Sequence, residues 1–92
     1  MLSQIPIRVD KVEKKLDCEI LRAAIIAELD AINLYEQLAA TTTNESIKKV
    51  LLEIVREEKT HVGEFQTLLL KEDKEQIEEL EKGRKEVENI TE

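Results

Sequence analysis

The sequence is poor in the residues that form turns, cross-links and aromatic cores. Its 92 residues include two glycines, one proline, one cysteine, one tyrosine, one phenylalanine and no tryptophan. The single cysteine, Cys18, excludes an intrachain disulfide framework, and we expect it to be a small packed residue. Because helix breakers are scarce, long helices are expected, and the predicted fold class is all-α.

The charge balance restricts the class of ligand. The chain has 21 acidic and 14 basic residues and a net charge of −7, which argues against nucleic acid or an anionic membrane and favours cations. No apolar run approaches the roughly 20 residues needed to span a bilayer, and no signal-peptide core is evident, so a cytoplasmic location is expected. A chain this short buries a modest fraction of its surface alone, so we also expect a partner subunit.

Hydrophobic periodicity predicts a single domain over 1–92. An N-terminal arm over 1–16 is expected before three helices at 17–41, 44–71 and 74–90, the first two forming an antiparallel hairpin.

Short polar side chains mark the two connections between these helices. The stretch "TTTNES" separates the first two, and Thr43 or Asn44 is expected to cap the second. Asp73, with Gln76 three residues later, has the spacing of a capping box and is expected to open the third helix.

Each long helix carries an apolar ridge at alternating steps of four and three residues. The two ridges are Leu21, Ile25, Glu28, Ile32, Tyr35, Ala39 and Ile47, Leu51, Ile54, Glu58, His61, Phe65, Leu68. Glu28, Glu58 and His61 interrupt these ridges near their middles. A charge in an apolar seam is costly unless it is paired or binds a metal, so the three residues predict one shared cation site.

Each of these residues taken singly has a plainer interpretation. A lone histidine such as His61 is usually hydrogen-bonded within a core or at its edge, and Glu58 could be solvated beside Glu57. Tyr35 is more often a core tyrosine than a neighbour of a metal site. Taken together, the Glu58-x-x-His61 pair lies on one helix face, and Glu28 supplies a facing carboxylate.

This set is half of that in di-iron carboxylate bundles, in which two helices each give a glutamate and two each give Glu-x-x-His. Two copies related by a twofold axis would supply four carboxylates and two imidazoles, which suffice for two iron ions. The sequence therefore predicts a homodimer that completes a ferritin-like four-helix bundle.

The segments "AIIAELDAINLYEQLA" and "IVREEKTHVGEFQTLL" resemble the encapsulated ferritins, over roughly residues 17–75. The resemblance implies a ferroxidase that oxidises Fe(II) with O₂ and feeds iron mineralisation and storage inside an encapsulin nanocompartment. It implies a di-iron centre liganded by Glu28, Glu58 and His61 of both subunits, with Tyr35 beside it. It also implies a decamer built as a ring of dimers, and the encapsulin shell protein as a partner.

Two departures from that family are visible. Some relatives have further acidic residues around the bridging glutamate that form an outer metal site; here Ala27 replaces one of them and Asp30 matches the other. Cargo relatives end in a short targeting tail, whereas this chain ends in "KEVENITE", so we expect a removed tail or targeting by fusion to the shell protein.

Three other functions fit the same residues. The first is a rubrerythrin-like di-iron peroxidase or oxidase, which peroxide consumption would distinguish from a ferroxidase. The second is a non-catalytic module whose metal, for example zinc, only holds hairpins together. The third is a metal-free helical interaction protein.

Overall fold

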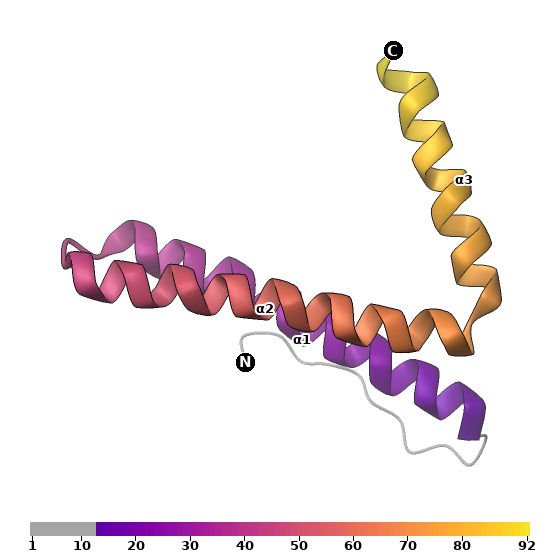
Figure 1. Cartoon of the computed structure of the whole chain (residues 1–92), viewed down its shortest axis with the longest axis horizontal. Helices are drawn as coiled ribbons and strands as arrows, with labels where there is room; N and C mark the ends of the chain where they lie inside the picture. The colour runs from indigo at the N-terminus through magenta and orange to yellow at the C-terminus, as the bar shows by residue number, and fades with distance from the viewer. Residues whose placement is uncertain (1–12) are drawn as a thin grey trace.

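The computed structural model describes residues 13–92, and this part of the chain contains three helices and no strand (Figure 1). The helices are α1 (Glu13–Thr41), α2 (Glu45–Glu72) and α3 (Lys74–Thr91). The predicted all-α class, with a long hairpin and a shorter third helix, is confirmed.

The helix bounds differ slightly from the predicted ones. α1 begins at Glu13, four residues before the expected start at residue 17. The residues gained are Glu, Lys, Lys and Leu, all good helix formers, so nothing in the sequence stops the helix earlier. The expected arm over 1–16 loses its last four residues to α1, and the rest of it lies outside the described residues.

Asn44 caps α2, which confirms one of the two predicted caps, Thr43 or Asn44. Its backbone is extended, and its side-chain Oδ1 accepts hydrogen bonds from the backbone N–H groups of Ser46 (3.0 Å) and Ile47 (3.1 Å). The Thr42 hydroxyl oxygen in turn accepts from the Asn44 N–H at 3.1 Å. These bonds satisfy donors that a helix start leaves unpaired, so the hairpin turn has a fixed conformation.

Asp73 is the single residue between α2 and α3. Its Oδ1 accepts from the Gln76 N–H at 3.1 Å, which is the first half of the predicted capping box. The second half, a bond from the Gln76 side chain back to the Asp73 N–H, is not what the structure shows. That N–H instead donates to the Leu69 carbonyl at 2.9 Å, in the last turn of α2. Only one of the two hydrogen bonds of the predicted capping box is therefore formed.

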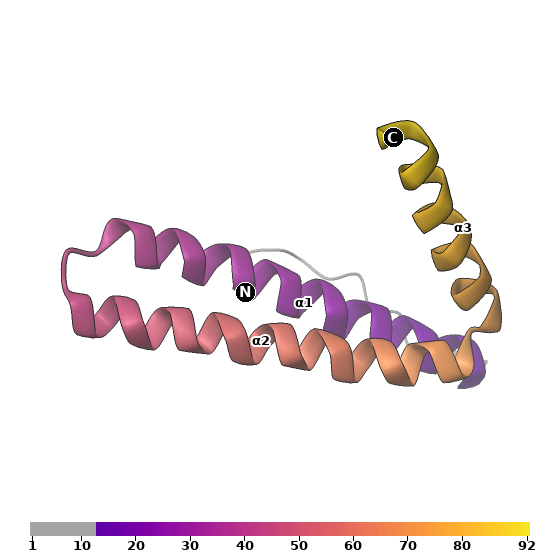
Figure 2. The same ribbon diagram turned by 45° about the horizontal axis from the view of Figure 1, so that its top comes forward.

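Helices α1 and α2 lie side by side and antiparallel along the hairpin (Figures 1 and 2). The buried apolar residues of the described chain are mostly small: Cys18, Ala23, Ile32, Ala39, Val55, Leu69. Cys18 is a free, buried thiol, as predicted. Small side chains let two helices approach closely, but they bury little apolar area, so the hairpin alone has a thin core.

The predicted ridge of α2 does not point at the centre of α1. The buried residues of α2 are Val55 and Leu69, each one position along from a ridge residue. Ile47 and Leu68, both ridge members, are 50% and 49% exposed. The ridge therefore lies along the edge of the hairpin interface, with one side open.

Helix α3 leaves the end of the hairpin steeply and contacts little of it (Figures 1 and 2). Its apolar residues Ile77, Leu80, Val87 and Ile90 are all exposed. The radius of gyration is 16.5 Å, whereas a compact chain of this length would have about 12 Å. Within the described residues, no helix is both long and apolar enough to cross a membrane.

Candidate metal centre

Glu28, Glu58 and His61 lie together halfway along the hairpin. Each offers one ligand atom, and these atoms are all within 4.8 Å of one another. His61 Nδ1 is 3.2 Å from Glu28 Oε2 and 3.8 Å from Glu58 Oε2. The structure thus brings the three predicted ligands to one place, and their role as ligands remains a prediction.

The helices position these side chains in a simple way. Glu58 and His61 are three residues apart on α2 and share a face, while Glu28 projects from α1 across the hairpin. Both glutamate side chains are 18% exposed, and the His61 side chain is 43% exposed. The carboxylates are therefore partly withdrawn from water, and the imidazole lies at the open edge.

The electrostatics of the cluster favour a cation. The hydrogen bond with Glu28 raises the pKa of Glu58, and burial and the negative charge of Glu28 raise it further. The hydrogen bond to Glu28 also raises the pKa of His61, with smaller contributions from the charges of both carboxylates. Protons are held tightly because negative charges crowd together, and a bound divalent cation would replace them.

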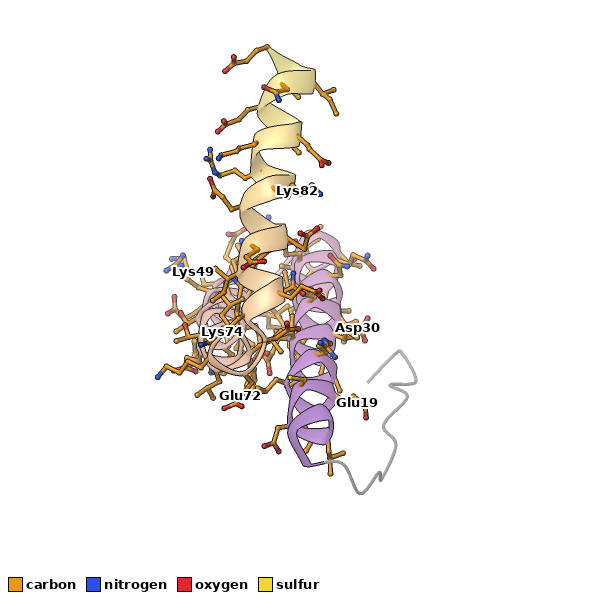
Figure 3. All side chains as sticks on the ribbon, turned by 90° about the vertical axis from the view of Figure 1, so that its right-hand side faces the viewer. Glu19, Asp30, Lys49, Glu72, Lys74 and Lys82 are labelled. Carbon is orange, nitrogen blue, oxygen red and sulfur yellow. The ribbon has the colours of Figure 1, made fainter. Side chains whose placement is uncertain are left out.

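The other two predicted residues lie outside this cluster. Tyr35 is half-buried on α1, two turns beyond Glu28, and the structure gives its hydroxyl no hydrogen bond to another described residue. Asp30 points from the side of α1 opposite to α2 (Figure 3) and is not among the grouped ligand atoms. Tyr35 was predicted to lie beside the metal centre, and Asp30 to belong to an outer metal site. Both roles remain predictions.

Two further carboxylates act on the centre, and sequence reasoning did not assign them to it. The charge of Glu57 raises the pKa of Glu58, and that of Glu64 raises the pKa of His61. The signal for Glu64 was its spacing, since a residue three positions after His61 shares its face. Both charges add to the attraction for a cation at the open edge.

The donor set fits iron, zinc or manganese better than it fits calcium or copper(I). Two carboxylate oxygens and one imidazole nitrogen form a mixed oxygen and nitrogen site without a thiolate, and the only cysteine is buried on its own. Three ligands leave coordination positions open for further ligands from a second copy, water or O₂.

Carboxylates and an imidazole held midway along two long antiparallel helices are characteristic of the ferritin-like class. Within that class the chain belongs to the rubrerythrin family, because the sequence model described as Rubrerythrin matches residues 19–92.

Two relatives narrow the resemblance. A ferritin-like–encapsulin shell fusion protein from Pyrococcus furiosus is 60% identical over 73 residues, which are 79% of this chain and 21% of that protein. The encapsulin nanocompartment cargo protein EncC from Myxococcus xanthus is 41% identical over 66 residues, covering 68% of this chain and 51% of that protein. The chain thus spans about a fifth and about half of these relatives. The predicted likeness to encapsulated ferritins is confirmed.

A solved structure extends the likeness to the whole fold. The encapsulated ferritin domain from Pyrococcus furiosus is 51% identical, with a TM-score of 0.87 covering 99% of this chain and 96% of that one. α3 contributes 18 of the 92 residues. The coverage of 99% leaves out too few residues to exclude α3, so α3 is part of the match.

Proposed function

We propose that the chain is a ferroxidase that oxidises Fe(II) with O₂ at a di-iron centre shared across a homodimer. The observation that carries the proposal is the cluster of Glu28, Glu58 and His61 at an open edge of the hairpin. A single hairpin supplies three ligands, too few for two iron ions. A twofold axis beside this edge doubles them to four carboxylates and two imidazoles.

The surface around the cluster supports a second copy. Val50, His61 and Leu68 are separated by 11 and 7 residues, close to three and two helical turns, so they share one flank of α2. Val50 is 60% exposed. At the far end Leu68 lines a groove together with Ile20 of α1. An exposed apolar band that flanks a half-buried acidic site on both sides is what a dimer interface across that site requires.

The chemistry follows from the ligand set. Carboxylate oxygens bind Fe(II) and bind Fe(III) more strongly, so oxidation is favoured while the substrate is held. Two Fe(II) ions give up one electron each, and with two protons they reduce one O₂ to hydrogen peroxide. Protons held by Glu58 and His61, whose pKa values are raised, are displaced when iron binds, and these protons become available at the site.

We also propose an encapsulin shell protein as the partner, with a location inside an encapsulin nanocompartment in the cytoplasm. Both relatives are named for encapsulin, one as a shell fusion and one as cargo. Dimers would assemble into a ring of five. A ring of thin hairpins encloses no large volume, so mineralised iron would need the shell as its container.

The test is the initial rate of Fe(II) oxidation, measured with O₂ consumption under matched iron-to-subunit ratios. Glu28→Gln, Glu58→Gln and His61→Ala should each lower the rate at least about 100-fold, because losing even a group that only orients a metal ligand typically costs about 10–100-fold. Glu53→Gln is the matched control, because Glu53 lies on the same helix, is exposed, and pairs only with Arg56 among the described residues. Wild-type rates in the three cluster variants would overturn the proposal.

A second candidate is a di-iron peroxidase, which the match to the Rubrerythrin model favours. The same residues would serve it, with hydrogen peroxide as the oxidant in place of O₂. Anaerobic mixing of the Fe(II)-loaded protein with hydrogen peroxide separates the two. Oxidation much faster than that by O₂ would assign peroxidase activity, and slower oxidation would favour the ferroxidase.

A further inference from the structure

Asp73 makes two different contacts at the junction of α2 and α3. Its Oδ1 caps α3 by accepting from the Gln76 N–H at 3.1 Å. Its Oδ2 accepts from Arg22 Nη2 at 2.8 Å, and Arg22 lies on α1, 51 residues earlier. One carboxylate therefore joins the start of α3 to the N-terminal third of α1.

The surroundings of the Arg22–Asp73 contact explain why it matters for the direction of α3. Beyond its first turns α3 has almost no packing against the hairpin, and its apolar residues are exposed. A groove beneath the junction is lined by Arg22 and Ile26 of α1, Leu70 of α2, and Gln76 and Leu80 of α3. Without a buried apolar contact to orient it, a helix joined by a single residue would pivot about that residue.

The Asp73 side chain is 19% exposed and that of Arg22 49% exposed. An ion pair this exposed adds little to overall stability, but it also has a well-formed charge-assisted geometry. Its effect is thus better measured as a restriction of angle than as a gain in melting temperature.

We propose that the Arg22–Asp73 pair is a strut that fixes the direction of α3 relative to the hairpin. Asp73 is a positioning residue, since it acts on the chain's own geometry and touches no substrate. The strut works together with the cap: Oδ1 starts the helix and Oδ2 anchors its start to α1.

The distance between α1 and α3 tests the strut directly. Spin labels are placed at the exposed positions Glu36 and Lys85 of the full chain, with Cys18→Ala to remove the buried thiol. The labelled protein is diluted with unlabelled protein, so that each assembly carries about one labelled chain, and the distance distribution is read by pulsed electron paramagnetic resonance.

Four variants in this background separate the strut from its alternatives. Asp73→Asn keeps an oxygen that caps α3 and removes the charge, and Arg22→Gln removes the other partner. Each should broaden the distance distribution at least about twofold, and the double variant should broaden it no further than either alone. Arg56→Gln is the matched control, because it breaks a pair within α2, with Glu53, and should leave the width unchanged.

The proposal is overturned by three results. Arg22→Gln and Asp73→Asn distributions as narrow as that of Arg56→Gln would show that the pair does not orient α3. Broadening by Asp73→Asn alone would assign the effect to the cap. If the double variant broadens the distance distribution by the sum of the two single effects, Arg22 and Asp73 act through independent contacts. Helicity by circular dichroism is recorded for every variant, so that loss of α3 itself is distinguished from loss of its direction.

Discussion

His61 Nδ1 lies 3.2 Å from Glu28 Oε2, across the interface between α1 and α2. When Nδ1 carries a proton, this contact is a hydrogen bond that links the two helices at the depth of the cluster. In that state of the metal-free chain, the proton takes the place of a cation between the same groups. Metal binding and protonation are alternatives at this site, and the next three predictions depend on that competition.

Glu58→Gln should stabilise the metal-free protein while abolishing its stabilisation by metal. The pKa of Glu58 is raised, first by its hydrogen bond with Glu28 and then by burial, so its charged form is disfavoured in the fold. A neutral amide removes that repulsion. We expect the Tm of the metal-free variant to rise by about 2–4 °C, which corresponds to about 0.5 kcal/mol for a chain of this size.

The measurement is thermal unfolding at one subunit concentration, because the Tm of an oligomer depends on concentration. Glu53→Gln removes an exposed carboxylate from the same helix. It should change neither the Tm of the metal-free protein nor the rise in Tm on metal binding by more than about 1 °C. A metal-free Glu58→Gln variant that unfolds below the wild type would mean that the charged carboxylate stabilises the fold without metal.

Raised pKa values at Glu58 and His61 also predict the pH dependence of the metal-free protein. Both groups bind protons more tightly when folded, so their stabilising effect is complete below the unfolded pKa and is lost as the pH rises through the folded one. For His61 this window begins at its ordinary value of 6.5. The Tm of the metal-free protein should fall as the pH rises above that value.

Binding of a redox-inert divalent cation should then release protons and become tighter as the pH rises. Titration calorimetry with Mn(II) in two buffers of different ionisation enthalpy counts those protons. Near pH 6.5 we expect a release that His61→Ala reduces by about half a proton or more, because the imidazole is then largely protonated in the free protein. Equal heats in the two buffers would contradict the assignment of both groups as ligands.

The sequence was sufficient to predict the all-α hairpin and the grouping of the three candidate ligands. Asn44 and Asp73 have local cap chemistry that any structure must satisfy, so the helix ends near them were predictable. Glu28, Glu58 and His61 stood out because each is polar at a ridge position, and helical spacing alone places such residues on one face.

What the sequence could not supply was the identity of the neighbour on each face. Within the single chain, Ile47 and Leu68 of the α2 ridge are half exposed, and Val55 and Leu69 take the buried positions. Periodicity reports that a face is apolar, not which chain covers it. The Arg22–Asp73 contact was also beyond reach, because two charged residues 51 positions apart have no spacing that marks them as partners.

The open flank of α2 gives the last prediction. If a second copy covers it, Leu68→Asp or Val50→Asp would bury a carboxylate in an apolar interface, at a cost of about 3 kcal/mol and hence a roughly 100-fold weaker dimer. Sedimentation velocity should show that loss, and Fe(II) oxidation should fall in parallel because half of the ligands depart with the partner. Ile90→Asp is the control: Ile90 is 82% exposed near the end of α3, away from the cluster, so the dimer and its rate should persist. Full activity from a monomeric Leu68→Asp variant would show that one hairpin suffices and would contradict the shared centre.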